Sequence, residues 1–572
     1  MIKTFAGHGL DDKSMKIRFD YSLEGFHAIL STPDGDVYID PYLKGMQSHY
    51  ISYYTKDNHI DPNVKEMLQN GHAHEGDMHL EWLETSGGDN SPFREKEDET
   101  ENSGTANLYK FQLALACTGE YAANHGGTTA GVLSAMAYAL SRVNFIFERE
   151  VSIRLELVPN NDEIIYLDGA TDPYTNGNAG NMMNENTFNL NSVIGVGNYD
   201  VGHVFSTSPC TITLAGQTVN IAGVSGGTGI VCGDNKARGV SCEWSVSDQF
   251  YIGTLCHELG HQFGAPHPWS NCNPDWNQTQ LTPGAAYEPG SGSTIMSYAG
   301  TCGTNNVQFN SDFYFHVNSL QTIMDFSREF GGVACSEVIP TDNLEPEIQT
   351  PFGGGMKIPI GTPFQLNAFA SDPNPDDTLT YCWEQYDLGP PSPLGSPIGN
   401  APAFRTFEPN LHGYRSFPRI GTILANQTNI TEVLPTYARD LSFRCTVRDS
   451  KWGGAGTVWK EISFNSVESA GPFLVTHPNS FETFEIGEYV DVTWDVANTT
   501  NSQVNCQRVN ILLADDGTNY QYMLAENIIN DGSYTVVIPD VLTNFARIKI
   551  EAADNIFFDL SLIHISEPTR PY

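Results

Sequence analysis

A stretch with the sequence HELGHQFGAPH at 257–267 carries the residue types that bind a transition metal. On a helix, His257 and His261 are separated by about 40° around the axis and about 6 Å along it, so both imidazoles can reach one ion. Gly264 tolerates the left-handed backbone that ends a helix, and the chain can then turn back to offer His267 as a third ligand. Three neutral nitrogens leave the fourth tetrahedral position to water, which is the arrangement of a catalytic zinc ion.

The positions that define this stretch resemble the long zinc signature of the metzincins, a family of zinc metallopeptidases. They are His257, Glu258, His261, Gly264 and His267. Residues 105–335 are most similar to the secreted bacterial reprolysin-like members of that family. The resemblance implies an α+β catalytic domain with a mixed sheet, an active-site helix and a Met-turn. One departure from the family pattern is Cys256, directly before the first histidine.

Glu258 lies about 100° further round the helix than His257, so its carboxylate can reach a water molecule on the ion without acting as a ligand. Zinc lowers the pKa of such a water to about 7. We expect Glu258 to be the general base that accepts the proton and passes it to the leaving amine. The resemblance therefore implies a secreted zinc-dependent endopeptidase that hydrolyses peptide bonds in protein and peptide substrates.

The segment SGSTIMSYAG places Met296 29 residues after His267 and looks like the metzincin Met-turn. The resemblance gives Met296 the role of an apolar floor below the ion, with no ligand role. Tyr298 matches the Met-x-Tyr of astacin-like and serralysin-like members, where the phenol reaches the metal or the oxyanion. The alternative is a tyrosine packed in the core. Residues 200–207 resemble the edge strand beside which substrate adds as an antiparallel strand.

Two other interpretations stay open. The chain could be a non-catalytic surface adhesin or binding protein on a peptidase-like scaffold, although a module that only binds has no need of the Glu258 carboxylate. Alternatively, Glu288 could replace His267 as the third ligand, although the short spacing through Gly264 favours His267.

The elements that position this stretch follow from the hydrophobic pattern. From residue 109, YKFQLALAC alternates as a strand, residues 128–148 carry helical spacing, and residues 152–158 form a second strand. A strand, a long helix and another strand are typical of a βα-type sheet domain.

Composition divides the rest of the chain. Residues 1–104 are expected to form a small β-rich, prosegment-like unit that ends in an acidic linker. A second linker at 336–351 precedes two all-β sandwich domains, one immunoglobulin-like or cadherin-like at 352–467 and one at 468–560. The sandwiches would bind or position substrate, a matrix or a surface. Residues 561–572 look like a non-native tail.

Two further groups could bind cations. Asp372, Asp376 and Asp377 precede a strand with a spacing seen in calcium-binding sandwich modules, and hard oxygen ligands suit calcium. Acidic turns are nevertheless common in so anionic a chain. In the N-terminal unit, a solvated loop is the simpler interpretation of four residues that could also cap zinc: His72, His74, Asp77 and His79.

The charge excludes several classes of partner. The 572 residues hold 29 Lys and Arg against 68 Asp and Glu, a net charge of −39. Nucleic acids and anionic membranes need a basic face, so neither is expected. No run of 18 apolar residues occurs, so we expect no membrane span. The first residues lack the apolar run of a signal peptide, which we expect to have been removed or truncated from a secreted protein.

The 11 cysteines are too scattered for a zinc ribbon, and their odd number leaves at least one thiol outside intrachain bridges. Two pairs could form local disulfides: Cys272 with Cys302, and Cys232 with Cys242. A bridge between Cys382 and Cys445 is not favoured, because strand alternation places them on opposite faces.

Overall fold

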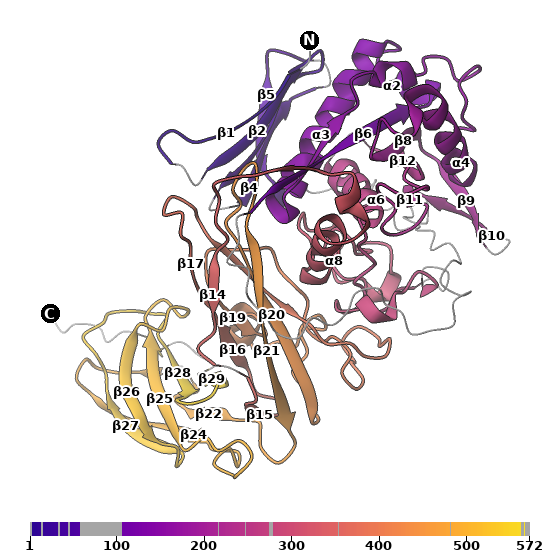
Figure 1. Ribbon diagram of the computed structural model, residues 1–572. Helices are drawn as coiled ribbons and strands as arrows, with labels where there is room; N and C mark the ends of the chain where they lie inside the picture. The colour runs from indigo at the N-terminus through magenta and orange to yellow at the C-terminus, as the bar shows by residue number, and fades with distance from the viewer. Residues whose placement is uncertain are drawn as a thin grey trace.

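The computed structural model describes residues 3–57, 106–561 and 565–566, apart from short gaps at 13–14, 33–34, 44–45, 215–216, 246–247, 274–277, 353 and 481. The N-terminal residues form an antiparallel sheet whose strands follow one another in sequence order. They are β1 (Lys3–His8), β2 (Lys16–Ser22), β3 (Gly25–Thr32), β4 (Gly35–Pro41) and β5 (Tyr50–Tyr54). The sheet packs beside helix α3 (Figure 1). The acidic linker predicted at the end of residues 1–104, together with His72, His74, Asp77 and His79, lies outside the described residues.

The next unit is a mixed sheet with helices packed on it. The sheet order is β11-β12-β8-β6-β13, and β7 pairs with β6. The bounds are β6 (Leu108–Cys117), β7 (Ile153–Leu157), β8 (Val201–Thr207), β11 (Gly223–Ser225), β12 (Gly239–Glu243) and β13 (Glu337–Ile339). The helices are α2 (Gly119–Asn124), α3 (Thr129–Val151), α4 (Ala179–Leu190), α6 (His257–Gln262) and α8 (Val317–Arg328). The predicted strand, helix and strand between 109 and 158 are confirmed.

The expectation that 200–207 is the edge strand is wrong. Strand β8 is paired on both sides, in parallel with β12 and with β6. Its first six residues are all buried, which is the burial pattern of a central parallel strand covered on both faces. The edge is β11, which runs antiparallel to β12.

Helix α3 is the core helix of this unit. Thr128 caps its first turn by accepting a hydrogen bond from the Gly131 amide, and Ser152 ends it with a left-handed φ of 58°. By length and apolar composition it is the one helix in the described chain that could cross a membrane, but 72% of its most apolar window is buried inside the protein.

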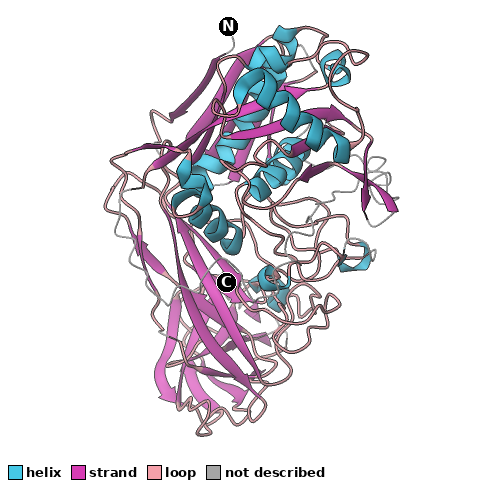
Figure 2. Cartoon of the chain, turned by 45° about the vertical axis from the view of Figure 1, so that its right-hand side comes forward, coloured by secondary structure: helices cyan, strands magenta, loops and turns pink. Residues whose placement is uncertain are grey.

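From residue 340 on, the described residues are all β apart from one short helix, α9 (Ile420–Leu424), and most of the strands there lie in the lower part of Figure 2. The first group centres on the sheet β15-β21-β20-β18, with β16 paired to β19 and β14 to β17. The second group holds the sheets β22-β24-β27 and β26-β25-β28-β29. A single cluster of buried apolar side chains runs through both groups. The chain is thus multidomain, with an α+β part followed by an all-β part.

The strands of the first group are β14 (Glu347–Gln349), β15 (Lys357–Pro359), β16 (Phe364–Asn367), β17 (Phe369–Ser371), β18 (Thr380–Gln385), β19 (Tyr414–Phe417), β20 (Arg439–Arg448) and β21 (Thr457–Val467). Those of the second are β22 (Leu474–His477), β24 (Tyr489–Asp495), β25 (Arg508–Ala514), β26 (Tyr522–Ile529), β27 (Ser533–Val537), β28 (Arg547–Ala552) and β29 (Phe558–Leu560). Within the predicted tail, β30 (Ile565–Ser566) pairs with β23 (Glu482–Thr483).

Buried polar contacts join the α+β part to the first group of strands. Arg448 of β20 forms an ion pair with Glu150 of α3 at 2.9 Å, and both side chains are 1% exposed. The amide of Val317 donates to Glu384 of β18 at 3.2 Å. Burial raises the pKa of Glu384 to about 8, although Arg448 lowers it. Buried ionisable groups therefore lie at the junction of the two parts.

Three disulfides form among the described residues: Cys210–Cys242, Cys232–Cys335 and Cys272–Cys302. The predicted Cys272–Cys302 pair is confirmed, whereas the predicted Cys232–Cys242 pair is wrong, because the fold brings each of these residues next to a more distant partner. Cys382 and Cys445 are free thiols. Cys382 lies opposite Thr446 on the neighbouring strand, so the adjacent Cys445 points to the other face.

Candidate metal centre

Two of the predicted metal ligands, His257 and His261, lie on a helix that changes its hydrogen-bonding pattern just before them. Residues 248–250 (α5) are α-helical, Tyr251–Cys256 form a π-helical turn, and α6 (His257–Gln262) returns to α-helical hydrogen bonding. A π turn inside a helix is rare and often marks a functional site. We refer to residues 248–262 as the active-site helix.

The active-site helix ends as the sequence predicts. Gly264 has a φ of +103°, in the left-handed region that favours glycine, and its amide donates to the carbonyl of His261 at 2.8 Å. The chain then turns back through Pro266 and places the ring of His267 4.7 Å from that of His261.

Three histidine nitrogens meet at one point. His261 Nε2 lies 3.0 Å from His257 Nε2 and 3.1 Å from His267 Nε2, and all three side chains are at most 2% exposed. A tetrahedral zinc ion with Zn–N distances of about 2.0–2.1 Å would hold its ligand nitrogens about 3.3 Å apart. The spacing of the three nitrogens therefore suits one such ion.

The other nitrogen of each ring is held by a backbone carbonyl. His257 Nδ1 donates to Ile295 O at 2.8 Å, His261 Nδ1 to Ala265 O at 2.6 Å, and His267 Nδ1 to Gln280 O at 2.9 Å. Because each Nδ1 carries the proton, each Nε2 presents a lone pair to the common point. This is the outer arrangement that orients histidine ligands on a metal, so the residues fit a zinc ion.

Glu258 directly follows His257 on the active-site helix and has 0% exposure. The edge strand β11 runs directly against it: a Cβ atom on Gly223 would lie 2.6 Å from Glu258 Oε1 and 2.7 Å from Glu258 Cγ. Only glycine leaves room for the carboxylate here. The structure thus brings together the three predicted ligands, the predicted base and the edge of the sheet.

Comparison with known proteins agrees with this geometry. Residues 107–325 match the family described as Metallo-peptidase family M12B Reprolysin-like. This segment belongs to the reprolysin-like metallopeptidases. No curated protein matches the chain.

Solved structures add nothing to this assignment. The chicken CNTN1 FN1–FN3 domains share 11% identity over 41% of this chain and 66% of that chain, with a TM-score of 0.16. The titin domains z1z2 in complex with telethonin share 12% identity over 40% of this chain and 100% of that chain, with a TM-score of 0.13. TM-scores this low carry no argument about the fold.

Met296 lies under the active-site helix of the reprolysin-like domain. It has 0% exposure, and a Cβ atom on Gly260 would overlap its sulfur. The neighbouring residue Ile295 supplies the carbonyl that holds His257. The position of Met296 is consistent with an apolar floor, and this role stays a proposal.

Tyr298 contacts a ligand through its ring. The ring centroid lies 4.6 Å from that of His267 and 5.2 Å from that of Trp269, on which it stacks. Trp269 and Tyr298 form a buried cluster with the Cys272–Cys302 disulfide. Tyr298 is therefore packed in a core and adjacent to the ligands, and a catalytic role for its hydroxyl stays a proposal.

Glu288 forms hydrogen bonds within the loop that precedes Met296 and is not grouped with the three histidine nitrogens. Its carboxylate accepts hydrogen bonds from the Ser293 amide at 2.6 Å, from Thr294 Oγ1 at 2.6 Å and from Ser297 Oγ at 3.0 Å. Burial raises its pKa, and these hydrogen bonds oppose the rise. In this structure His267, and not Glu288, completes the group of three ligands.

The predicted calcium ligands are only partly brought together. Asp372 and Asp377 lie near Asp449, and the three carboxylates could meet one ion, whereas Asp376 is not part of this group. Lys451 Nζ lies 3.1 Å from Asp377. Burial lowers the pKa of Lys16, and the negative charges of the three carboxylates raise it, so Lys16 is also close to this group. Two ammonium groups thus already balance the acidic cluster, and calcium there stays a prediction.

Sequence analysis missed the residues that lock the end of the active-site helix to the sheet. Gln262 Oε1 accepts a hydrogen bond from His203 Nδ1 at 3.0 Å, and Gln262 Nε2 donates to Gly202 O at 3.1 Å. His203 Nε2 lies 2.9 Å from Ser241 Oγ. Burial lowers the pKa of His203 to about 4, so the ring is neutral. No local pattern marks these residues, because their partners are about 40 to 60 positions apart in sequence.

Proposed function

We propose that this chain is a secreted zinc endopeptidase, with His257, His261 and His267 as zinc ligands and Glu258 as the general base. The observation that supports it most is the meeting of three Nε2 lone pairs beside a buried carboxylate. The match of residues 107–325 to the reprolysin-like metallopeptidases supports the same chemistry.

When bound, zinc would polarise the peptide carbonyl and lower the pKa of water. Glu258 would accept the proton of the attacking water and deliver it to the amine of the departing peptide. Its burial against Gly223 restricts the carboxylate to few orientations, which keeps it aimed at that water. Met296 would form the apolar floor of a Met-turn, and Tyr298 would donate a hydrogen bond to the developing oxyanion.

A peptide substrate would add to the sheet at β11. In the described sheet β11 pairs with β12 on one side, and its other side is free of a neighbouring strand. An extended peptide could pair there in the antiparallel direction, with main-chain hydrogen bonds giving affinity for many sequences. The carboxylate of Glu258 lies next to this strand, so the scissile bond would pass in front of the base.

The proposed location outside the cell rests on the disulfides. Three bridges among the described residues suit an oxidising compartment, since cytosolic thiols are kept reduced. Fractionation of the producing cells, with the protein followed by antibody, would test this part.

The experiment that tests the function is hydrolysis of an unfolded protein such as casein by the purified chain, before and after zinc removal with a chelator. We expect cleavage that stops on chelation and returns with zinc, and mass spectrometry would identify the cut bonds. A protein that binds one zinc ion yet cuts nothing would favour the alternative of a surface binding protein.

A further inference from the structure

A buried polar chain links the N-terminal sheet to the start of the active-site helix. Arg142 of α3 donates through Nη2 to Asp40 of β4 at 2.8 Å and through Nε to Asp248 of the active-site helix at 2.9 Å. The side chains of Arg142 and Asp248 are 1% and 2% exposed, and that of Asp40 is 16% exposed. One guanidinium therefore holds a carboxylate from each of the two elements.

The N-terminal sheet contacts this chain at further points. The hydroxyl of Tyr53 on β5 donates to Asp40 at 3.0 Å and lies 3.5 Å from Asp248. The guanidinium of Arg142 lies 4.7 Å from the ring of Tyr38 on β4 and 4.7 Å from that of Tyr138 on α3. Arg142 is thus enclosed partly by side chains of the sheet.

An aromatic chain follows the same route. The ring of His27 on β3 lies 4.3 Å from that of Tyr138, and Tyr138 contacts the ring of Tyr251 edge-on at 4.9 Å. Tyr251 is 2% exposed and belongs to the π turn of the active-site helix. Two independent sets of contacts therefore reach the first turns of that helix, at Asp248 and Tyr251, which lie about 13 Å and about 9 Å along an α-helical axis from His257.

The charges couple the two carboxylates to each other through Arg142. Two carboxylates share one guanidinium, so the buried group carries an excess negative charge when both are ionised. Burial raises the pKa of Asp248 to about 6, Arg142 lowers it, and Asp40 raises it. The ionisable groups that face Asp248 are Arg142, Asp40, Tyr53, Tyr38, Tyr138 and Tyr251. Removing Asp40 would leave Arg142 with one carboxylate partner, Asp248, instead of two.

We propose that the N-terminal sheet is a built-in positioning element for the zinc-binding helix, acting through Asp40, Arg142 and Asp248. The sheet holds Arg142, Arg142 fixes the start of the active-site helix, and the helix carries His257 and His261. This proposal rests on the proposed zinc site but not on peptide hydrolysis. It gives the sheet a role in the working protein, in contrast to a prosegment that is removed.

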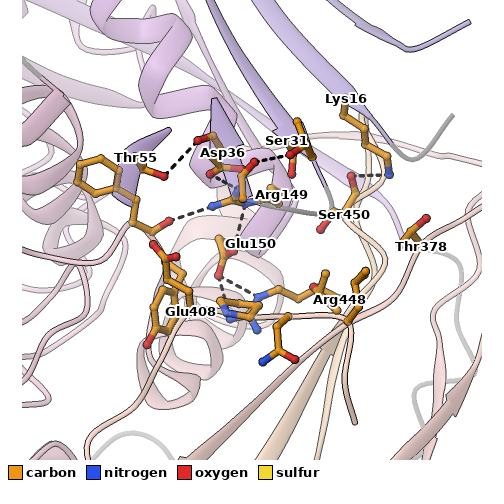
Figure 3. A pocket seen from close by; sticks show the side chains of 18 of the residues that line it. Lys16, Ser31, Asp36, Thr55, Arg149, Glu150, Thr378, Glu408, Arg448 and Ser450 are labelled. Carbon is orange, nitrogen blue, oxygen red and sulfur yellow. Dashed lines mark hydrogen bonds and ion pairs between the residues drawn. The ribbon is translucent and has the colours of Figure 1, made fainter. Parts of the chain in front are cut away.

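The same strand supplies a matched control. Asp36 of β4 forms an ion pair with Arg149 of α3 at 2.8 Å, with exposures of 14% and 13% (Figure 3). Arg149 also donates to Phe313 O and lies 3.3 Å from Glu150. Glu150 in turn forms an ion pair with Arg448 in the first group of strands. Asp36 and Asp40 therefore make similar bonds from one strand to one helix, but only Asp40 is linked to Asp248.

The test compares Asp40→Ala with Asp36→Ala in the full chain. Zinc affinity is measured by competition with a chelator, and hydrogen exchange is followed over residues 248–262. We expect Asp40→Ala to weaken zinc binding and to speed exchange of this helix by about 2- to 30-fold, as for other coupled positions. Asp36→Ala should stay close to the unmodified protein in both measurements.

Equal effects of the two variants, or no effect of Asp40→Ala in a folded protein, would overturn the proposal. If Asp40→Ala does not fold, Tyr53→Phe removes only the hydroxyl that bridges Asp40 and Asp248, and we expect a smaller change in the same direction. An unmodified protein that binds zinc but cuts no peptide would reject the peptidase function and leave this inference intact, because neither readout needs hydrolysis.

Discussion

Gly223 on the edge strand and Glu258 on the active-site helix are in direct contact, with 2.6 Å between the Cβ position of the glycine and Glu258 Oε1. A contact this short cannot accommodate a methyl group. The edge strand can therefore approach the proposed base this closely only because residue 223 has no side chain.

Gly223→Ala should displace the Glu258 carboxylate and lower kcat/KM by about 100-fold or more, since general-base catalysis contributes roughly 10²- to 10⁴-fold. Zinc content, measured by elemental analysis, should stay at one ion per chain. Gly197→Ala is the control, because nothing lies within 4 Å of its Cβ position. Equal activity of the two variants would contradict the proposed contact.

Glu258→Gln should keep the zinc ion and lose most hydrolysis, by about 10²- to 10⁴-fold in kcat. The amide keeps the size of the side chain but cannot accept the proton of water at neutral pH. Steady-state assays on a mapped peptide, with metal analysis of the same sample, check both parts. A variant that keeps most of its activity would remove Glu258 from the mechanism.

His267→Ala and Glu288→Gln decide the third ligand. We expect His267→Ala to weaken zinc binding by more than about 100-fold, beyond the effect of losing an outer partner of a ligand. Glu288→Gln should change zinc affinity much less but lower the free energy of unfolding by about 1–3 kcal/mol, because it disturbs buried hydrogen bonds. The reverse order of zinc affinities would assign the ligand role to Glu288.

Loss of the Cys272–Cys302 disulfide should affect the zinc site, whereas loss of Cys210–Cys242 should not. The sequence separations are 30 and 32 residues, so each double alanine variant should lose a similar stability of about 3–4 kcal/mol. Only the first bridge packs with Trp269 and Tyr298, next to His267. Thermal unfolding and zinc competition on both variants test this, and equal zinc affinities would count against it.

The stability of the protein should fall between about pH 4.5 and pH 8, in part through Glu384. Its folded pKa is raised from 4.5 to about 8 by burial, so its contribution is fully present below pH 4.5 and is lost as the pH rises through 8. Glu384→Gln mimics the protonated form and should flatten this part of the curve. Denaturant unfolding of both proteins at pH 5, 6, 7 and 8 provides the comparison, and parallel curves would show that Glu384 does not titrate in this range.

The local chemistry of the site could be predicted from sequence because it depends on neighbours in the chain. The four-residue spacing of His257 and His261 places both on one helix face whatever surrounds the helix, and Gly264 allows the turn that returns His267. Strands β6 and β7 and helix α3 were equally predictable, since apolar periodicity reports which face of a segment is buried.

Only the tertiary structure decided which distant residues meet. β8 resembles the metzincin edge strand in sequence but is central, and Cys232 pairs with Cys335 rather than with the nearby Cys242. Asp40 and Asp248 reach Arg142 across 102 and 106 residues. A local sequence pattern determines the backbone of one turn or one strand. The partner of a buried charge or thiol depends instead on how whole helices and strands pack, and the sequence next to either residue does not indicate that partner.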